Sequence, residues 1–274
     1  MYAGQCGLRL SLDPVDPAPA ADQSAKSIIY LTPMFSNQIA LPVGNGTWSL
    51  FSMPASSGYT VTGLTSSTNY DLGLSVNTTT GAFTFSVNVW TNDTTPPTRT
   101  RQDGVLCTAT NTILLGSFRA VSATTAQDTA GSRWLSNVYN PIKRRLYAYD
   151  STTTRTTSST SWVTDNANTT DGQGRFSYTQ AIANYPVFVR QAVQSSMSGG
   201  AGTSQSGLGV NSTTVVTSPI STTIGSTGWS AGLYCSVGIP STIGITYVQR
   251  LIATTTNTMG VSNLGTYTEG EIWN

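Results

Sequence analysis

The chemistry open to this chain is limited first by a residue that it lacks, since none of its 274 residues is histidine. Without imidazole, the Ser-His-Asp triad, the Cys-His nucleophilic pair and histidine metal sites are all excluded. Carboxylate chemistry remains, and glycoside hydrolysis needs only two acids that face each other across the scissile bond. The candidate acids are Asp103, Asp128, Asp150, Asp165, Asp171, Glu269 and Glu271.

Glu269 and Glu271 are the only glutamates, and they stand two residues apart. On a strand this spacing puts both on one face, with side chains roughly 7 Å apart. That separation falls inside the range of inverting glycosidases, but both carboxylates would lie on the same side of a bound sugar. We therefore favour a charged strand end over a catalytic pair, and we expect a non-enzymatic protein with no catalytic residues.

Two polar segments could in principle hold a ligand. The stretch DNANTTD, Asp165 to Asp171, offers the oxygen ligands that calcium prefers, but its spacing does not match an EF-hand loop, and we favour an Asn/Asp-rich turn. The stretch SGGAGTSQSG, with Gly199 to Gly207, lacks the Gly-Lys-[Ser/Thr] of a phosphate loop, and its composition predicts a flexible surface loop. We therefore expect no cofactor and no metal.

The six tryptophans are the residues best suited to contact a glycan, because exposed aromatic rings stack on sugars. Trp48 and Trp90 continue strand patterns and are predicted to lie in a core. Trp162 and Trp229 stand among Ser, Thr and Gly, so these two are the candidates for glycan contact, with core packing as the alternative for each.

The composition indicates an all-β protein. Charged residues are 9% of the chain against a usual quarter, lysine occurs only at 26 and 143, and β-branched Thr and Val are abundant. A net charge of +1 gives no basic field for nucleic acid, and the cluster Lys143 to Arg145 is expected to form a solvated or interface face. Three distant cysteines indicate a reducing compartment, and no signal peptide or membrane-spanning run is visible.

The pattern along the chain predicts an arm and two domains. Prolines and aspartates in SLDPVDPAPAADQSAK predict an extended N-terminal arm over 1–26, either lying across a partner subunit or floppy. Short alternating runs predict a small fibronectin-like β-sandwich over 27–95. The stretch TNDTTPPTRTR, Thr91 to Arg101, predicts a stiff connection. Eight or more strands then predict a larger β-sandwich or jelly roll over 102–274.

Several phrases occur together in a characteristic order. They are CGLRLSLDPVDPAPAADQSAKSIIYLTP, NQIAL, TWSLF, the Gly-Leu-Thr…Asn-Tyr-Asp corner, VWTNDTT, RQDGVL…LLGSFR and a closing EGEIWN. In this order the chain resembles a family of tailed-phage and prophage virion proteins described as minor tail, head-spike or capsid-decoration proteins. The resemblance covers the whole length, is strongest over Cys6 to Asn140 and at the C-terminus, and carries no catalytic signature.

The resemblance implies a β-rich assembly component on the exterior of a virion, made in the host cytoplasm. The expected partners are further copies of the chain in a homotrimer, a major capsid or tail protein, and host surface polysaccharide; no nucleic acid and no membrane insertion is expected. A capsid decoration or head-spike protein is favoured because the chain has no shaft of its own. A tail fibre or tail spike with a receptor-binding or polysaccharide-depolymerising module is the alternative, and a secreted adhesin is a third.

Overall fold

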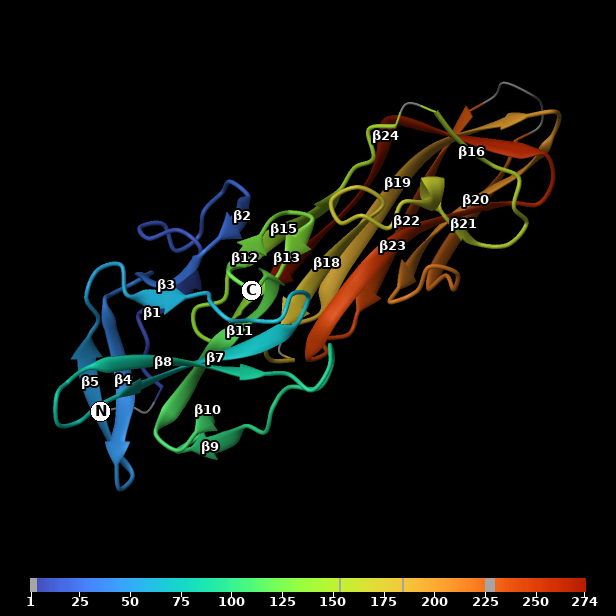
Figure 1. Cartoon of the computed structure of the whole chain (residues 1–274). Coiled ribbons are helices and arrows are strands. Elements are labelled where there is room, and N and C mark those ends of the chain that lie inside the picture. Colours follow the sequence, from blue (N-terminus) through green and yellow to red (C-terminus); the bar gives the residue numbers. More distant parts are fainter. Residues whose placement is uncertain (1–3, 153, 184, 225–229) are drawn as a thin grey trace.

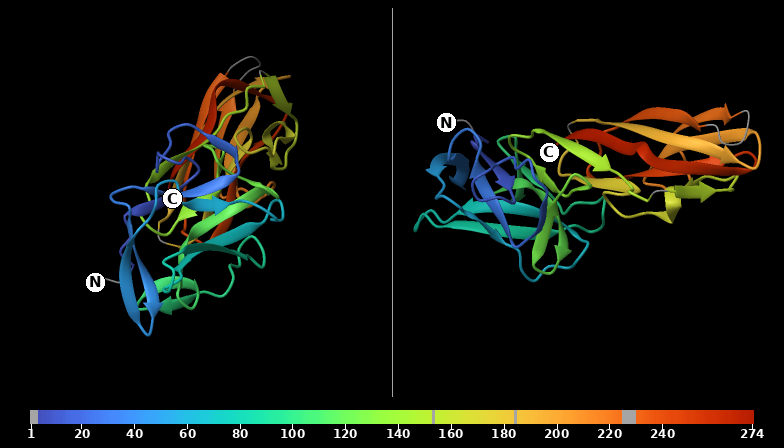
Figure 2. Two further views of the ribbon diagram at one scale, coloured as in Figure 1. Left: turned by 60° about the vertical axis from the view of Figure 1, so that its left-hand side comes forward. Right: turned by 90° about the horizontal axis from the view of Figure 1, so that it is seen from above.

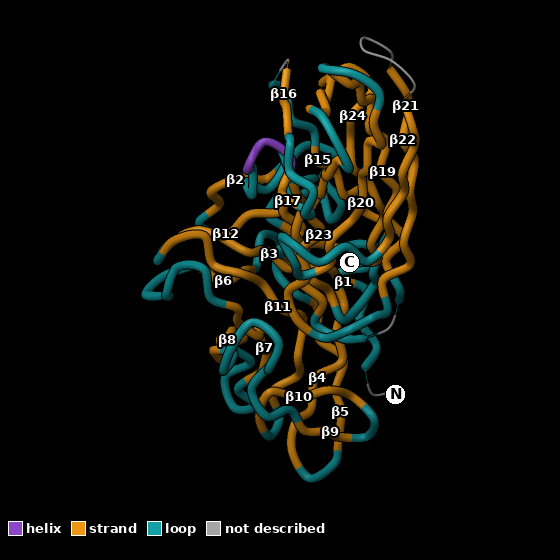
Figure 3. Tube along the Cα trace, turned by 90° about the vertical axis from the view of Figure 1, so that its right-hand side faces the viewer, coloured by secondary structure: helices purple, strands orange, loops and turns teal. Residues whose placement is uncertain are grey.

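The computed structural model describes residues 4–152, 154–183, 185–224 and 230–274, and these form almost entirely antiparallel β-sheets. Within these ranges the only helical segment is a 3₁₀ turn, η1 (Asp165–Ala167), drawn in purple in Figure 3. The prediction of an all-β protein built from sandwich-like domains is confirmed. No helix among the described residues is long and apolar enough to cross a membrane.

The strands gather into two bodies that lie end to end (Figures 1 and 2). The first body takes up the N-terminal half, blue to green in Figure 1. Its strands are β1 (Leu8–Ser11), β2 (Gln23–Lys26), β3 (Ile28–Pro33), β4 (Gln38–Gly44), β5 (Thr47–Ser52), β6 (Gly58–Thr60), β7 (Asn69–Val76), β8 (Phe83–Val89), β9 (Thr100–Gln102), β10 (Val105–Ala109), β11 (Thr112–Ser122), β12 (Thr125–Asp128) and β14 (Leu135–Asn137). The short strand β13 (Ser132–Arg133), between β12 and β14 in the chain, pairs with a sheet of the second body.

The first body is organised around β11, which pairs with β7 on one edge and with β10, β12 and β14 on the other. The Gly-Leu-Thr corner that leads into β7 is closed by Tyr70, whose hydroxyl accepts a hydrogen bond from the backbone N–H of Thr65 at 2.8 Å. The ring of Tyr70 stacks on Phe118 of β11 at 5.7 Å between centroids. This corner has the geometry of the tyrosine corner of immunoglobulin-like sandwiches.

The N-terminal segment is part of this body, which differs from the predicted arm over 1–26. Leu8, Leu10 and Leu12 are buried in the first core, and β1 pairs with β3 in register from Leu8 to Ser11. The prolines begin only at Pro14, after the strand, so they end β1 rather than prevent it. The alternation of the three leucines was the signal for a strand.

The second body is a sandwich of two sheets, yellow-green to red in Figure 1. Its core joins side chains of both sheets, such as Leu146 and Ile272 from one and Phe176 and Val248 from the other. Its strands are β15 (Lys143–Ala148), β16 (Thr154–Thr157), β17 (Val163–Thr164), β18 (Arg175–Gln180), β19 (Val187–Ser198), β20 (Gly202–Val210), β21 (Ser218–Ile224), β22 (Ser230–Ile239), β23 (Gly244–Thr254) and β24 (Thr258–Trp273).

The strand order of the second body is that of a jelly roll. One sheet runs β15-β24-β19-β22 and the other β18-β23-β20-β21, with β13, β16 and β17 added to them. If β15 and the strands β18 to β24 are numbered 1 to 8 in chain order, the two sheets read 1-8-3-6 and 2-7-4-5. All connections but that of β20 with β21 then cross from one sheet to the other, as in a double Greek key. The prediction of a jelly-roll-like second domain is therefore confirmed.

The Gly/Ser-rich stretch from Gly199 to Gly207 was predicted to be a flexible loop, and this is wrong for most of its length. Residues from Gly202 onward form β20, a central strand that pairs with both β21 and β23. Ser204 and Ser206 are fully buried, and the Ser206 hydroxyl accepts a hydrogen bond from the Gln191 side-chain amide of β19. Small side chains are used here because the facing sheet comes close, which a composition-based loop prediction cannot detect.

The division between the bodies falls between Asn137 and Lys143 rather than between 95 and 102. The predicted connection, Thr91 to Arg101, packs on the first body through Arg99, which forms a two-point ion pair with the fully buried Asp71 of β7 at 2.7 Å. The same guanidinium donates to the backbone oxygen of Ala181 in the second body at 2.6 Å. The segment therefore fastens the two bodies together instead of spacing them.

Substituting Asp71→Asn is expected to lower the free energy of unfolding by about 3–5 kcal/mol, because it leaves the buried Arg99 without a counter-charge. Chemical denaturation followed by tryptophan fluorescence measures this change. Glu271→Gln is the control: it removes the exposed partner of Lys143, so its cost is expected to stay under about 1 kcal/mol. Equal costs for the two variants would contradict the role given to Asp71.

Candidate binding face

The outer side of the β15-β24-β19-β22 sheet is the most distinctive surface of the second body, and we call it the outer face. Strand alternation creates it, because successive side chains of a strand point to opposite sides. On β15, Lys143, Arg145 and Tyr147 point outward, whereas Leu146 and Ala148 are fully buried in the core.

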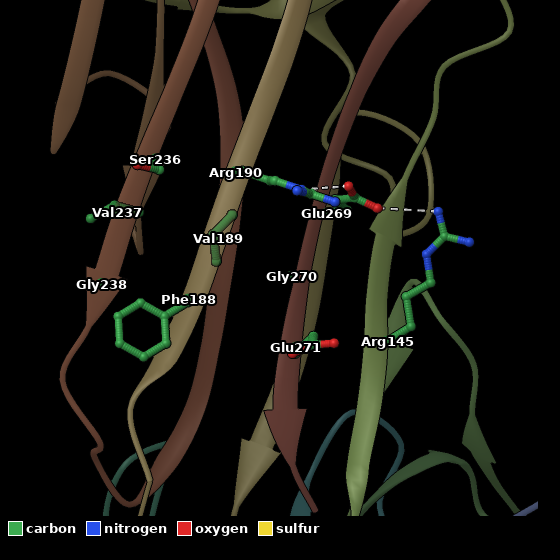
Figure 4. Close-up of a pocket in the computed structure, with 10 residues that line it drawn as sticks. All are labelled: Arg145, Phe188, Val189, Arg190, Ser236, Val237, Gly238, Glu269, Gly270 and Glu271. Atoms are coloured by element: carbon green, nitrogen blue, oxygen red, sulfur yellow. Dashed lines mark hydrogen bonds and ion pairs between the residues drawn. The ribbon is translucent and has the colours of Figure 1, made fainter.

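Ion pairs occupy the middle of the outer face. Glu269 accepts a hydrogen bond from Arg190 Nε at 2.6 Å and another from Arg145 Nη2 at 3.3 Å, so its carboxylate bridges β19 and β15 (Figure 4). Glu271 pairs with Lys143 at 3.1 Å. The hydrogen bond from Arg190 to Glu269 raises the pKa of this arginine above its usual value.

Aromatic side chains flank the ion pairs. Phe188 is 68% exposed and Tyr234 is 67% exposed, both far above what is usual for residues of this size. At the end of the sheet Trp273 packs against Tyr185 at 5.3 Å, with the ammonium of Lys143 5.9 Å from the indole centroid. Exposed aromatic side chains gathered on one sheet are typical of a surface that binds a ligand or another protein.

The outer face holds both glutamates of the predicted pair. They do share one side of a strand, as expected, but each is tied to a cation of a neighbouring strand. Phe188 and Arg190, which border them, were not singled out from the sequence. Their neighbours across the ladder, Gly238 and Ser236, lie about fifty residues further along the chain, so sequence spacing gives no sign of the grouping.

Among the predicted aspartates, Asp150 and Asp165 lie in a buried cluster inside the second body. Asp165 is fully buried and pairs with Arg250 at 2.6 Å and Arg155 at 3.3 Å, and Arg155 also pairs with Asp150 at 3.5 Å. Burial by itself raises the pKa of Asp150, but hydrogen bonds from Thr152 and Asn168 and the charge of Arg155 together outweigh it and bring the pKa to about 2. These acids stabilise the fold through arginines.

The other predicted acids also have structural partners. Asp128 lies between Arg133 and Arg144, each at 3.3 Å. Asp103 accepts a hydrogen bond from Trp48 Nε1 at 2.7 Å. Asp171 pairs with Arg175 at 2.8 Å and accepts hydrogen bonds from the hydroxyls of Ser132 and Ser177. The two acids of DNANTTD, Asp165 and Asp171, are thus held by different arginines. Within the described ranges no three His, Cys, Asp or Glu residues gather as a metal cluster would.

Trp162, one of the two tryptophans predicted to contact a glycan, does not lie on the outer face. Trp162 is half-buried and directly precedes β17, which pairs with β23 of the opposite sheet. Trp229 lies outside the described residues. Trp90 is buried as predicted, donating to Asp71 at 2.7 Å, and Trp48 packs against the first core.

A polar groove of about 680 Å³ lies where the two bodies meet. Its charged groups are already paired, since Arg119 bonds to Asp93 at 2.6 Å and its guanidinium lies 5.8 Å from the Trp134 ring centroid. The indole N–H of Trp134 donates to the Ser177 hydroxyl of the second body at 2.7 Å. These contacts join the bodies. The other aromatic ring of the groove, Tyr247, lies under the guanidinium of Arg175 at 5.1 Å, so both rings are already covered by arginines.

The cysteines are suited to packing rather than to nucleophilic chemistry. All three are free thiols, and burial raises the pKa of Cys6 and of Cys235 to about 11. A thiol with such a pKa is almost wholly protonated at neutral pH, and only the thiolate is a good nucleophile.

Comparisons with known proteins leave the chain without an established family. No family model matches it, and no curated protein matches it. Among solved structures, a chain of infectious bursal disease virus Gt strain is similar over 94% of this chain and 73% of its own length, at 12% identity and a TM-score of 0.28. A β-porphyranase of glycoside hydrolase family 86 from Bacteroides plebeius gives 14% identity and a TM-score of 0.26, with 76% of this chain covered.

A third similar structure is dimeric latent PorU from Porphyromonas gingivalis, at 12% identity and a TM-score of 0.27. The chain spans 30% of the length of the porphyranase and 21% of that of PorU. TM-scores this low support no argument about either fold or function. The fold and the surface of this chain therefore define it as a two-body β protein with a jelly roll and an exposed aromatic face.

Substituting Asp150→Asn is expected to flatten the acid dependence of stability. The folded-state pKa of about 2 lies below the ordinary value of 3.8, so the ionised group stabilises the fold above about pH 4, and this contribution is lost as the pH falls through 2. Urea denaturation at several pH values measures the effect: the gap between the native chain and the variant should narrow from pH 4 to pH 2. A constant gap would show that the carboxylate is not ionised preferentially in the folded state.

Proposed function

We propose that the chain is a non-enzymatic structural protein on the exterior of a bacteriophage particle, a capsid decoration (cement) or head-spike protein that assembles as a homotrimer. The observation that carries the proposal is the jelly-roll strand order of the second body, since double-sheet jelly rolls build many viral shells and lectins. The order of sequence phrases that resembles phage virion proteins supports the same assignment. Because one fold can serve many functions, the surface must agree with it as well.

The surface agrees with binding better than with catalysis. The glutamates of the outer face lie on one strand and are both paired with cations, so neither stands opposite the other across a bound sugar. The bare aromatic rings beside them suit contact with another molecule. We assign attachment to a capsid or tail protein to the first body, and contact with host surface polysaccharide to the second, which projects from it (Figure 1).

A tail fibre or tail spike is the second candidate, and the exposed aromatic rings favour its receptor-binding form. The polysaccharide-depolymerising form would need a second acid on the far side of the bound sugar. On the outer face Glu269 and Glu271 are the only acids among the residues that line its depression.

Immunogold labelling of purified phage particles with an antibody against residues 143–274 tests the location. The proposal predicts label spread over the head. Label confined to the tail would replace the decoration protein with the tail-spike candidate. Particles from the same lysate that carry no label, with the chain found only in the soluble fraction, would contradict both.

The trimer is tested by light scattering on the purified chain at micromolar concentration, alone and with capsids. We expect a mass three times that of the chain in at least the capsid-bound state, because copies around a three-fold axis share one closed interface. A stable monomer in the presence of capsids would rule out the homotrimer while leaving the location open.

A further inference from the structure

We propose that the outer face binds a neutral pyranose unit of a polysaccharide, with Phe188 as the ring on which the sugar stacks and with Arg190, Glu269 and Arg145 as its hydrogen-bonding partners. This names the residues and the ligand class for the glycan contact of the proposed function, and it rests on that part of the function alone. It does not depend on where in the particle the chain resides.

The position of Phe188 makes it a platform. It stands opposite Gly238 in the ladder between β19 and β22, and a Cβ added to Gly238 would lie 3.3 Å from Cε1 and 3.6 Å from Cδ1 of the ring. One edge of the ring therefore lies beside the bare backbone of the glycine, where a larger residue of the next strand would crowd it. The rest of the side chain is largely exposed, and Figure 4 shows the ring beside Gly238 of β22.

An exposed aromatic ring is matched to the apolar face of a pyranose. The face of an aromatic ring carries partial negative charge, and the C–H groups on one side of a sugar ring carry partial positive charge. Because one edge of Phe188 already lies beside β22, part of its side-chain freedom is lost before a ligand covers it. Covering it also removes from water a side chain that is 68% exposed in the free protein.

The polar groups beside the ring are fixed in place and still have bonding capacity. Glu269 orients Arg190 through Nε, which leaves the Nη groups of this arginine without a hydrogen bond to any described residue. Arg145 is held to the other oxygen of the same carboxylate through Nη2. A ligand hydroxyl can donate to a carboxylate and accept from a guanidinium, so this planar arrangement presents both functions to a polyol.

Charge and size indicate a neutral saccharide. Arg145 and Arg190 balance Glu269 and Glu271 among the residues that line the depression, and Lys143 beside it is paired with Glu271, so no unpaired cation is left to select an anionic sugar or a phosphate. Its volume of about 700 Å³ falls in the range of small-ligand sites. The depression is partly open to solvent, which suits one unit of a longer chain.

The same arrangement argues against a protein partner as the occupant. The centres of protein interfaces are depleted of charged residues, glutamate and lysine above all, and a contact centred here would have to bury the row of ion pairs around Glu269 and Glu271. Hydroxyl groups of a sugar bond to these charges without removing them fully from water.

The test is affinity electrophoresis of the full chain in native gels that contain one polysaccharide each. The neutral probes are dextran, laminarin, galactomannan and mannan, and the acidic probes are alginate and hyaluronate. We expect retardation by at least one neutral probe and by neither acidic one. Retardation by none of the four neutral probes, or only by the acidic ones, would overturn the proposal.

Three variants tie the binding to the outer face. Phe188→Ala and Arg190→Gln should each weaken binding by about tenfold or more, whereas Phe35→Ala, which truncates a 78% exposed phenylalanine of the first body, should bind as the native chain does. Gly238→Ala keeps the ring but puts a methyl group 3.3 Å from it, so it should also weaken binding. Unchanged thermal unfolding separates these effects from misfolding, and full binding by Phe188→Ala would overturn the proposal.

Two further outcomes separate this inference from the proposed function. If Phe188→Ala instead dissociates an oligomer seen by light scattering, the outer face is an interface between copies, and the saccharide site is refuted. Particles that carry the label while the purified chain ignores every neutral probe would retain the virion role and remove the saccharide site. If the purified chain binds a neutral probe but is absent from particles, the saccharide site is retained and the virion role is removed.

Discussion

The arrangement of the whole molecule depends on the buried ion pair between Asp71 and Arg99. Asp71 is fully buried and receives four hydrogen bonds, from the indole of Trp90, from two nitrogens of Arg99 and from the hydroxyl of Ser117. Arg99 then reaches across to the backbone of Ala181. One carboxylate thus connects β7, β11, the segment after β8 and, through Arg99, the edge of the second body, and separating Arg99 from Asp71 would leave a charge unpaired in the interior.

The same solution recurs throughout the chain, and it explains how a protein with few charges uses them. Arginines are eleven of the thirteen basic residues, and a guanidinium offers a fixed fork of donors that can satisfy a carboxylate and a backbone oxygen together. Arg144 pairs with Asp128 and also donates to the backbone oxygen of Pro19, while Arg9 donates to the backbone oxygens of Pro17 and Asn274. Burial and the nearby Arg144 lower the pKa of Arg9 to about 10, which still leaves it charged at neutral pH. Charge in this chain joins segments that are distant in the sequence.

Some elements follow local rules that can be read directly from the sequence. Asp103 and Gly104 both take positive φ and close the hairpin between β9 and β10, as an Asp-Gly pair does. The hairpins of β4 with β5 and of β7 with β8 likewise follow their turn residues. The number of strand-like segments was enough to indicate a β-sandwich or jelly roll in the second half.

The elements that the sequence did not predict are set by long-range contacts. Leu8 to Leu12 alternate as a strand should, but the prolines that follow concealed this. Ser204 and Ser206 are polar, yet they are buried because the facing sheet comes close to them. The grouping of Phe188 with its neighbours on the outer face requires the register of β19 against both β22 and β24, which no local pattern contains.

Strand register links the joint between the bodies to the outer face. On β15, Arg144 points inward to the buried Asp128, while Arg145, its neighbour, points outward to Glu269. On β24 the fully buried Ile272 separates the outward-facing Glu271 and Trp273 in the same way. A slip of one residue would put an arginine into the core and an apolar side chain into water, so the burial that fixes the joint also fixes which side chains the outer face presents. The buried side chains on the inner side of these strands therefore hold the outer face rigid. For this reason its outward side chains can remain exposed until a ligand covers them.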